Sequence, residues 1–195
     1  RGLGPDLFAE GAGGEFALKH PFLLLSQHSV TTEYGEGERQ IMETLMAVHK
    51  LGVPTIALWP NADAGSEDVA PAMRKFREHC CDSKIHFFKN LPTHVYISLM
   101  RRTACLIGNS SSAIREGAFI GTASVNIGSR QAMRQRGSNI IDVDHNGSAI
   151  MDAIVAQMEH GPYDYEPIYG DGHAGERIAA VLARCSWQLQ KQITY

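Results

Sequence analysis

The sequence lacks the long apolar runs and the strong basic charge that mark two broad classes of protein. No stretch approaches the roughly 18 consecutive apolar residues of a membrane-spanning helix, and no signal-peptide pattern opens the chain. The formal net charge is -3, and no long basic run appears. A nucleic-acid or anionic-membrane partner would require a basic patch. We therefore predict no membrane and no nucleic-acid partner.

Cysteine is also scarce, and its spacing fits neither a zinc site nor a redox motif. Two of the four cysteines are adjacent, and none forms a C-x-x-C pair. Six histidines show no paired spacing for a metal and are interpreted as structural: His49, His79, His86, His94, His145 and His160. We predict reduced thiols in a cytoplasmic protein, with neither a metal site nor a bound cofactor.

At 195 residues the chain is long enough for one α/β domain with a substantial core, and short for two. Residues 1–20 include the glycine-rich stretch GLGPDLFAEGAGGE and are predicted to be a linker or a domain edge. Residues 21–195 are predicted to form one α/β lobe. Because the chain opens with Arg1 and not with Met, we expect it to be a piece of a longer protein.

Short apolar runs alternate with segments of helical spacing along the whole chain. The predicted strands are residues 22–27, 53–58, 85–88, 105–107, 122–127 and 139–143. The predicted helices are residues 38–50, 70–79, 95–101, 149–159 and 174–190, with a short helix after the strand at 122–127. This alternation predicts a Rossmann-like parallel sheet with helices on both faces.

Residues 104–130 carry the clearest functional signal. An apolar run is followed by three consecutive hydroxyls, Ser110, Ser111 and Ser112, and then by a helix-like stretch with Glu116. Ligands bind at the carboxyl ends of strands in open α/β sheets, and a helix's first turn offers N–H groups to a phosphate or diphosphate. The alternative is that the serines only cap the helix. However, three hydroxyls exceed what one cap needs, and no S-x-x-E box is present.

Polar residues also follow the other predicted strands. His28, Asn61 and Arg130 follow the first, second and fifth strands, and all carboxyl ends of a parallel sheet lie on one edge. Arg130 suits forked contacts with a diphosphate, and Glu116 could accept two hydrogen bonds from ribose hydroxyls. The plainer interpretations are a structural histidine, a surface arginine and a solvated helix glutamate.

Four segments in order resemble the C-terminal half of UDP-N-acetylglucosamine 2-epimerases, and most closely those of the hydrolysing branch. They are QHSVTTEYGE, LWPNADAGS, LIGNSSSAIREGAF with IGTASVNIGSRQ, and PIYGDGHAGERIA, and together they span about residues 21–183. The resemblance implies a two-lobed, glycosyltransferase-B-like fold in which this chain is the nucleotide-binding lobe. It also implies elimination of UDP from UDP-N-acetylglucosamine, followed by hydration to N-acetylmannosamine.

The same resemblance implies roles for single residues. Ser110 and Ser111 would hold the diphosphate of a UDP-sugar, and Glu116 would hold its ribose. The residues that would complete the site are Asn61 and Arg130 in the nucleotide pocket and a catalytic His28 near the diphosphate and sugar. The family's catalytic carboxylates belong to an N-terminal lobe, and no stretch of this chain corresponds to it. We therefore expect that lobe as a partner and expect the isolated chain to be inactive.

The sequence departs from the family pattern at Ser29, Ala113 and Ala123, where the family usually has proline, glycine and proline. Ala113 adds a Cβ beside the phosphate turn, so weaker binding is expected. Two other functions remain open: the lobe of an acceptor-using UDP-sugar glycosyltransferase, and a nucleotide-binding module without enzymatic activity. The identity of the UDP-amino sugar and the formation of a homo-oligomer are also left open.

Overall fold

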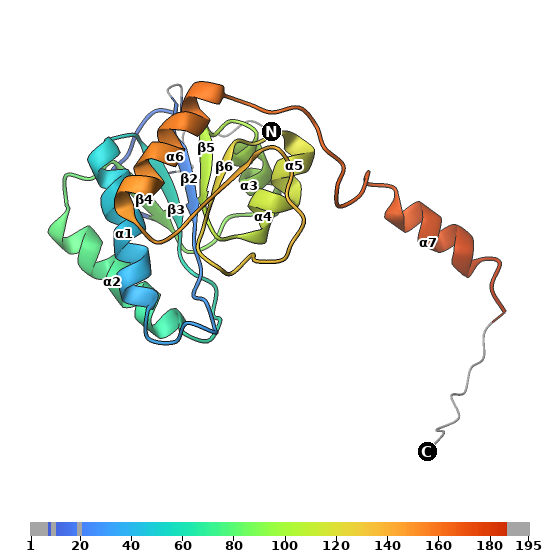
Figure 1. Ribbon diagram of the computed structural model, residues 1–195, viewed down its shortest axis with the longest axis horizontal. Helices are drawn as coiled ribbons and strands as arrows, with labels where there is room; N and C mark the ends of the chain where they lie inside the picture. The colour runs from blue at the N-terminus through green and yellow to red at the C-terminus, as the bar shows by residue number, and fades with distance from the viewer. Residues whose placement is uncertain (1–7, 9–10, 19–20, 187–195) are drawn as a thin grey trace, which may run out of the picture.

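The computed structural model describes residue 8, residues 11–18 and residues 21–186, which contain a seven-stranded sheet in the order β1-β4-β3-β2-β5-β6-β7 (Figure 1). The strands are β1 (Ala12–Gly13), β2 (Leu23–Ser26), β3 (Thr55–Leu58), β4 (Ile85–Phe88), β5 (Cys105–Gly108), β6 (Ser124–Ile127) and β7 (Ile140–Val143). Strands β2 to β7 are parallel, and β1 pairs antiparallel with β4. The predicted parallel α/β fold is confirmed.

The boundary between β2 and β5 is the topological switch point of the sheet. The chain runs from β2 through β3 to β4 on one side, and from β5 through β6 to β7 on the other. At the carboxyl ends of the two central strands, Ser26 pairs with Gly108. The segments that leave β2 and β5 therefore start side by side, which is where open α/β sheets bind ligands.

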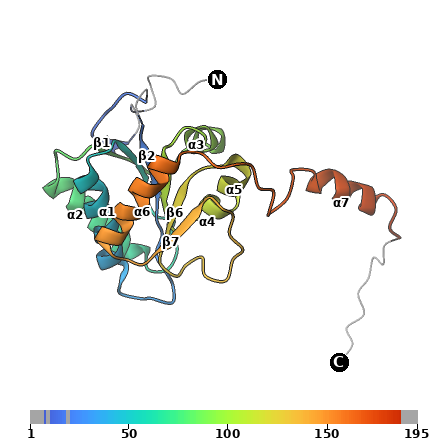
Figure 2. The same ribbon diagram turned by 45° about the horizontal axis from the view of Figure 1, so that its top comes forward.

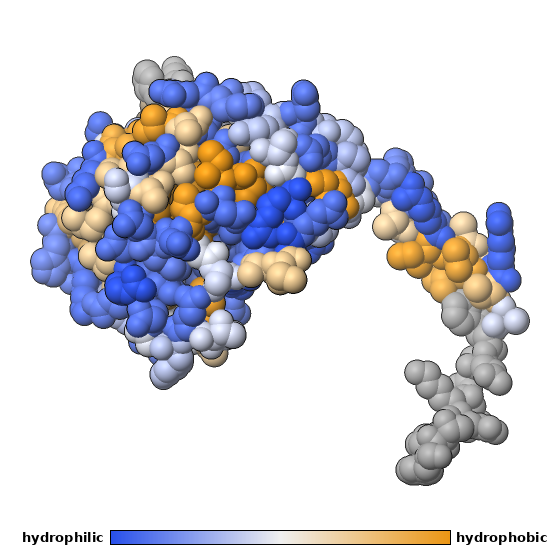
Figure 3. Space-filling model, viewed as in Figure 1, coloured by the Kyte–Doolittle hydropathy of each residue, from blue (hydrophilic) through white to orange (hydrophobic). Residues whose placement is uncertain are grey.

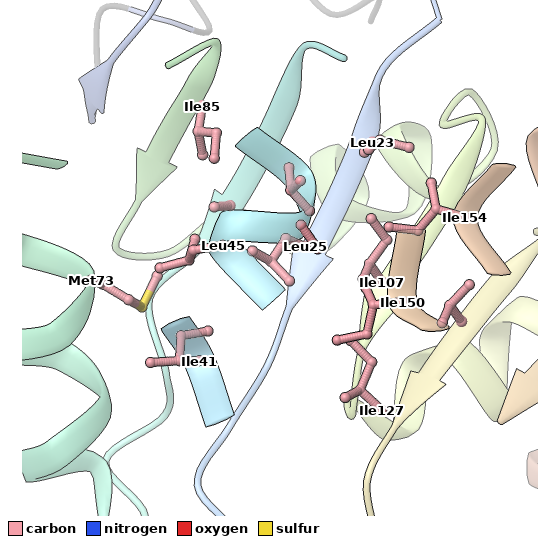
Figure 4. Close-up of a cluster of buried hydrophobic side chains, with 14 of the residues drawn as sticks. Leu23, Leu25, Ile41, Leu45, Met73, Ile85, Ile107, Ile127, Ile150 and Ile154 are labelled. Atoms are coloured by element: carbon pink, nitrogen blue, oxygen red, sulfur yellow. The ribbon is translucent and has the colours of Figure 1, made fainter. Parts of the chain in front are cut away.

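Helices cover both faces of the sheet (Figure 2). One face carries α1 (Gly37–Leu51), α2 (Ser66–His79) and α6 (Gly147–His160), and the other carries α3 (Thr93–Met100), α4 (Ser111–Ile114) and α5 (Glu116–Ile120). Side chains of a strand alternate between the two faces, and β2 shows this in its two clusters. Leu23 and Leu25 pack with Ile41 and Ile150 on the first face (Figure 4), while Leu24 packs with helix α3 on the second.

The described part of the lead segment belongs to the edge of the sheet. Ala12–Gly13 forms β1, which pairs with β4. Phe8, Phe16 and Leu18 pack against the cluster on the second face. Residues 12–13 therefore extend the sheet at its β4 edge, and the residues that follow pack on its second face.

Two predicted helices differ from the structure. The prediction of a short helix after residues 122–127 was wrong, because residues 129–134 form turns. Met133 has a φ of 63°, and the Arg136 side chain donates hydrogen bonds to the carbonyls of Gln131 and Arg134. The helix with Glu116 is broken at Arg115 into α4 and α5.

The last helix is shorter than predicted and stands apart from the sheet. It is α7 (Ala174–Leu182), and the predicted residues 187–190 lie outside the described residues. Its apolar side chains gather on an exposed surface (Figure 3), with Ile178 and Val181 each 58% exposed. Within the described residues, no helix combines the length and apolarity needed to span a membrane.

Candidate functional site

The turn after β5 is held directly against the end of β2. Gly108 has a φ of 122°, and a Cβ at this position would lie 2.2 Å from the carbonyl oxygen of Ser26. The backbone N–H groups of Asn109 and Ser110 each donate to that same oxygen at 3.2 Å. Only glycine allows this close approach with this backbone conformation, so Gly108 places the serine turn beside the segment that leaves β2.

The serine hydroxyls have different environments. Ser110 is the N-cap of α4, and its Oγ accepts from the N–H of Ser112 at 3.4 Å and lies 2.9 Å from the Ser112 Oγ. The Ser112 Oγ in turn lies 2.7 Å from the Tyr96 hydroxyl, and burial raises the pKa of Tyr96. Ser111 is half-buried, and its hydroxyl makes no hydrogen bond to any described residue. Capping therefore accounts for Ser110 but not for Ser111.

His28 is buried and is held on three sides. Its backbone N–H donates to the Asn109 Oδ1 at 2.7 Å, and its carbonyl accepts from the Asn109 Nδ2 at 2.8 Å. The ring Nδ1 accepts from the backbone N–H of Asn61 at 3.1 Å, so the neutral ring carries its proton on Nε2. The Nε2 atom lies 3.4 Å from the Ser26 Oγ, a long contact that holds this N–H only weakly.

The charge state of His28 follows from its surroundings. Burial first, and the Arg130 guanidinium second, lower the pKa of His28 to about 4, while the Asp63 carboxylate acts in the opposite direction. His28 is therefore a neutral imidazole near pH 7. It can donate one hydrogen bond from Nε2, but it has no proton to release as an imidazolium.

Asn109 connects three loops, although sequence reasoning gave it no role. It is fully buried, and its carbonyl accepts from Arg130 Nη1 at 3.3 Å and from Gln131 Nε2 at 2.7 Å. Its side chain holds both backbone groups of His28. The only sequence signal was its place before the three serines, which does not reveal partners this far along the chain.

Arg130 and Ser111 line one cavity of about 610 Å³ at this edge of the sheet. The guanidinium of Arg130 pairs with the Asp63 carboxylate at 3.2 Å, and Arg134 lines the same cavity. The remaining walls come mostly from residues 29–32, including the Thr31 and Thr32 hydroxyls. Two guanidiniums and several hydroxyls make this cavity suitable for a phosphate-bearing ligand.

A second residue that the sequence did not indicate, Glu33, ties two walls of this cavity together. Its carboxylate accepts hydrogen bonds from the Ser129 hydroxyl and, at 2.5 Å, from the Gln40 side-chain amide. The hydrogen bond from Ser129 is the main cause that lowers the pKa of Glu33. The loop after β2 is thus joined to the loop that carries Arg130.

Two predicted site residues lie elsewhere. Glu116 is the first residue of α5 and does not line the Ser111–Arg130 cavity. It lines a separate cavity of about 760 Å³ together with Ile97, Phe119 and Tyr165. Asn61 is exposed and lines neither cavity, and it contributes its backbone N–H to His28. Ser111 and Arg130 thus share one cavity that neither His28 nor Ser110 lines. His28 is linked to Arg130 through Asn109, and Glu116 lies on the other side of the α4–α5 break.

No three His, Cys, Asp or Glu side chains are grouped to hold a metal ion anywhere in the described ranges. The functional groups near this cavity are hydroxyls, two guanidiniums, the Asp63 carboxylate that pairs with Arg130, one imidazole and backbone N–H groups. Their chemistry is hydrogen bonding to an anion.

Comparisons with known proteins show what the sequence is similar to. Residues 9–183 match the family model described as UDP-N-acetylglucosamine 2-epimerase. The chain is 30% identical over 177 residues to a UDP-N,N'-diacetylbacillosamine 2-epimerase (hydrolyzing) of Legionella pneumophila, a match that covers 91% of this chain and 46% of that protein. It is 32% identical over 158 residues to the polysialic acid biosynthesis protein P7 of Escherichia coli, covering 75% of this chain and 39% of that protein.

Solved structures show the same fold. The crystal structure of a UDP-GlcNAc 2-epimerase from Neisseria meningitidis bound to UDP-GlcNAc superposes with a TM-score of 0.68 at 14% identity. The superposition covers 87% of this chain and 46% of that one. The chain thus spans less than half the length of these relatives.

Proposed function

Because the chain belongs to the UDP-N-acetylglucosamine 2-epimerase family, we propose that it is the nucleotide-binding, C-terminal lobe of such an epimerase. Its ligand is then a UDP-sugar, and the remaining half of the protein is an N-terminal lobe that closes over the same site. The lengths of the relatives support this proposal, since the chain spans 46% of the Legionella protein. The free thiols of all four cysteines fit a reducing compartment, and we place the protein in the cytoplasm.

The observation that carries the proposal is the cavity that Ser111 and Arg130 share beside His28. The Ser111 hydroxyl has no bond to any described residue, and the Arg130 guanidinium has only one carboxylate partner, Asp63. A diphosphate in this cavity would accept hydrogen bonds from both side chains. The cavity with Glu116 then takes the nucleoside, with the carboxylate on the ribose hydroxyls and the aromatic rings around it.

We propose the hydrolysing reaction, which the name of the Legionella relative supports. UDP-N-acetylglucosamine loses the proton at carbon 2 and the UDP leaving group, which gives a glycal and UDP. Water then adds to the glycal and gives N-acetylmannosamine. The groups that move the carbon-bound proton belong to the other lobe, so the isolated chain binds UDP without turnover.

His28 is the catalytic residue of this lobe in the proposed reaction. Its Nε2–H donates to the diphosphate as negative charge develops there during elimination. A neutral donor suits this role because its hydrogen bond becomes stronger as the leaving group gains charge, which lowers the barrier more than it tightens substrate binding. Arg130 and Ser111 hold the diphosphate in place through the same step.

Product analysis with the two-lobed protein tests the proposal. UDP-N-acetylglucosamine should give free N-acetylmannosamine and UDP in equal amounts. A UDP-linked N-acetylmannosamine would assign the non-hydrolysing reaction. Transfer of the sugar to an added acceptor would assign a glycosyltransferase, and binding of UDP without any turnover would assign a binding module.

A further inference from the structure

A further cavity lies away from the proposed UDP site. It measures about 820 Å³ and lies between α2 and the sheet edge formed by β4 and β1. Arg74 and Arg77 of α2 line it, as do Lys89 after β4 and Trp59 after β3. Among the described residues it shares no lining residue with the cavities of Ser111 and Glu116.

Three cations face this cavity, and no described residue supplies a counter-charge to them. None of the described lining residues is a carboxylate, and none of Arg74, Arg77 and Lys89 forms an ion pair or a side-chain hydrogen bond with any described residue. The neighbouring Lys75 differs, because its ammonium pairs with Glu38 at 2.8 Å outside the cavity. Like charges that lie close together repel one another, and a bound anion would replace this repulsion by attraction between each cation and the anion.

The floor of the cavity is apolar and aromatic. The half-buried Trp59 packs against Phe87 with ring centroids 5.9 Å apart, and the Arg74 guanidinium lies 5.8 Å from the Trp59 centroid. Arg77, half-buried, and Asn90 add polar groups at the rim. An apolar floor with guanidiniums at the rim fits a ligand that has a carbon skeleton and one or more anionic groups.

We propose that this cavity is a second ligand site, which binds a small metabolite bearing phosphate or carboxylate groups. The guanidiniums of Arg74 and Arg77 hold the anionic groups, Lys89 contributes from the opposite wall, and Trp59 and Phe87 contact the carbon skeleton. The site does not depend on the proposed reaction, since its residues belong to a different cavity from those of the UDP site.

The fluorescence of Trp59 reports on the cavity directly. In a Trp187→Phe background Trp59 is the one remaining tryptophan, and inorganic pyrophosphate and citrate serve as phosphate and carboxylate probes. Saturable quenching by at least one probe is expected, with a Kd of about 1 mM or tighter. No saturable change with either probe would overturn the proposal, and the probe that binds better identifies the anionic group.

Matched charge variants assign the binding to this cavity. Arg74→Gln with Arg77→Gln should weaken the probe by at least about tenfold, and Lys89→Gln from the opposite wall should weaken it as well. Lys75→Gln removes one positive charge from the same helix outside the cavity, and it should change the Kd less than about twofold. An equal loss in Lys75→Gln would show a general charge effect and contradict the site. Equal melting temperatures of all variants would show that their folds are intact.

Competition separates this site from the UDP site. Saturating UDP should leave the affinity for the probe unchanged, and Arg130→Gln should also leave it unchanged. Displacement of the probe by UDP would place it in the UDP site and would overturn the proposal, whatever the fate of the epimerase assignment.

Discussion

The ring Nδ1 of His28 accepts a hydrogen bond from the backbone N–H of Asn61, 33 residues further along the chain, at 3.1 Å. This contact joins the segment after β2 to the segment after β3 and leaves the ring proton on Nε2. A buried imidazole in this position is held in one tautomer and in one orientation. Its protonation would place a charge in a buried site and would remove the acceptor that the Asn61 amide needs.

We therefore predict that the free energy of unfolding decreases as the pH is lowered from about 6.5 to about 4. The pKa of His28 is lowered from 6.5 to about 4 on folding, so the unfolded chain binds the proton first. The contribution of His28 to the free energy of unfolding is fully present above pH 6.5 and is lost as the pH falls through this window. The total loss is up to roughly 3 kcal/mol. Urea unfolding at pH 7 and at pH 4.5 measures it. His28→Gln should show a weaker pH dependence, with a remainder from His145, whose pKa burial also lowers. An unchanged dependence in His28→Gln would contradict the assignment.

His28→Asn should lower kcat of the two-lobed protein far more than it weakens UDP binding. The asparagine side chain places its amide oxygen near the position of the imidazole Nδ1, where it can accept a hydrogen bond from the Asn61 amide, but it is too short to place a donor where the imidazole Nε2–H lies. Comparison of kcat per folded molecule with the melting temperature decides between a catalytic and a structural role. A lower melting temperature with unchanged kcat would make His28 a structural residue only.

Ser111→Ala and Ser110→Ala should affect different properties, the first UDP binding and the second stability. Ser111 makes no hydroxyl contact within the described structure, so its alanine variant should keep its stability and bind UDP more weakly, with uridine binding unchanged. Ser110 caps α4, so its alanine variant should lose about 1 kcal/mol of stability. Calorimetry with UDP and uridine, together with urea unfolding, measures both. Equal loss of uridine and UDP binding in Ser111→Ala would show that the turn had changed shape.

Glu116→Gln should weaken UDP and uridine together. A carboxylate that accepts two ribose hydroxyls contributes on the order of 1.5–3 kcal/mol, and the structure places Glu116 in a cavity apart from the diphosphate groups. Calorimetry with uridine is the direct measurement. Unchanged uridine affinity would make Glu116 a helix-surface residue and would leave the nucleoside site unassigned.

Glu33→Gln should loosen the loop that carries Arg130. Its amide would keep a contact with Ser129 or Gln40 but lose the two charge-assisted hydrogen bonds. UDP affinity should fall several-fold, and the amides of residues 129–131 should exchange hydrogen faster. Glu36→Gln is the control, since the exposed Glu36 pairs with Arg39 away from the cavity. Equal effects of the two substitutions would show a general loss of negative charge.

Local sequence patterns predicted the parallel strands well, because a continuous apolar run such as residues 22–25 is rarely stable anywhere but in a buried strand. They failed where a distant side chain decides the backbone. The turns at 129–134 replace a helix because Arg136 takes up two of their carbonyl groups. The break at Arg115 separates Glu116 from the serines, and no local pattern in the sequence marks it.

The site residues divide in the same way. The position of His28, Ser111 and Arg130 at one edge of the sheet could be predicted because the carboxyl ends of parallel strands meet there. The roles of Asn109 and Glu33 could not, because the side chains concerned bond to partners 81 and 96 residues away. A buried amide has no period or spacing of its own, so its partners become evident only in the folded chain.

The hydrogen bonds of Asn109 also limit how the specificity of this lobe can be redesigned. Its side chain and carbonyl connect the backbone of His28 with Arg130 and Gln131. A chimera that exchanges only one of these loops with a relative would bury unpaired polar groups in the others, at about 1–3 kcal/mol each. Loop exchange in this lobe therefore has to move the three segments as one block, and natural variation among relatives should be correlated across them.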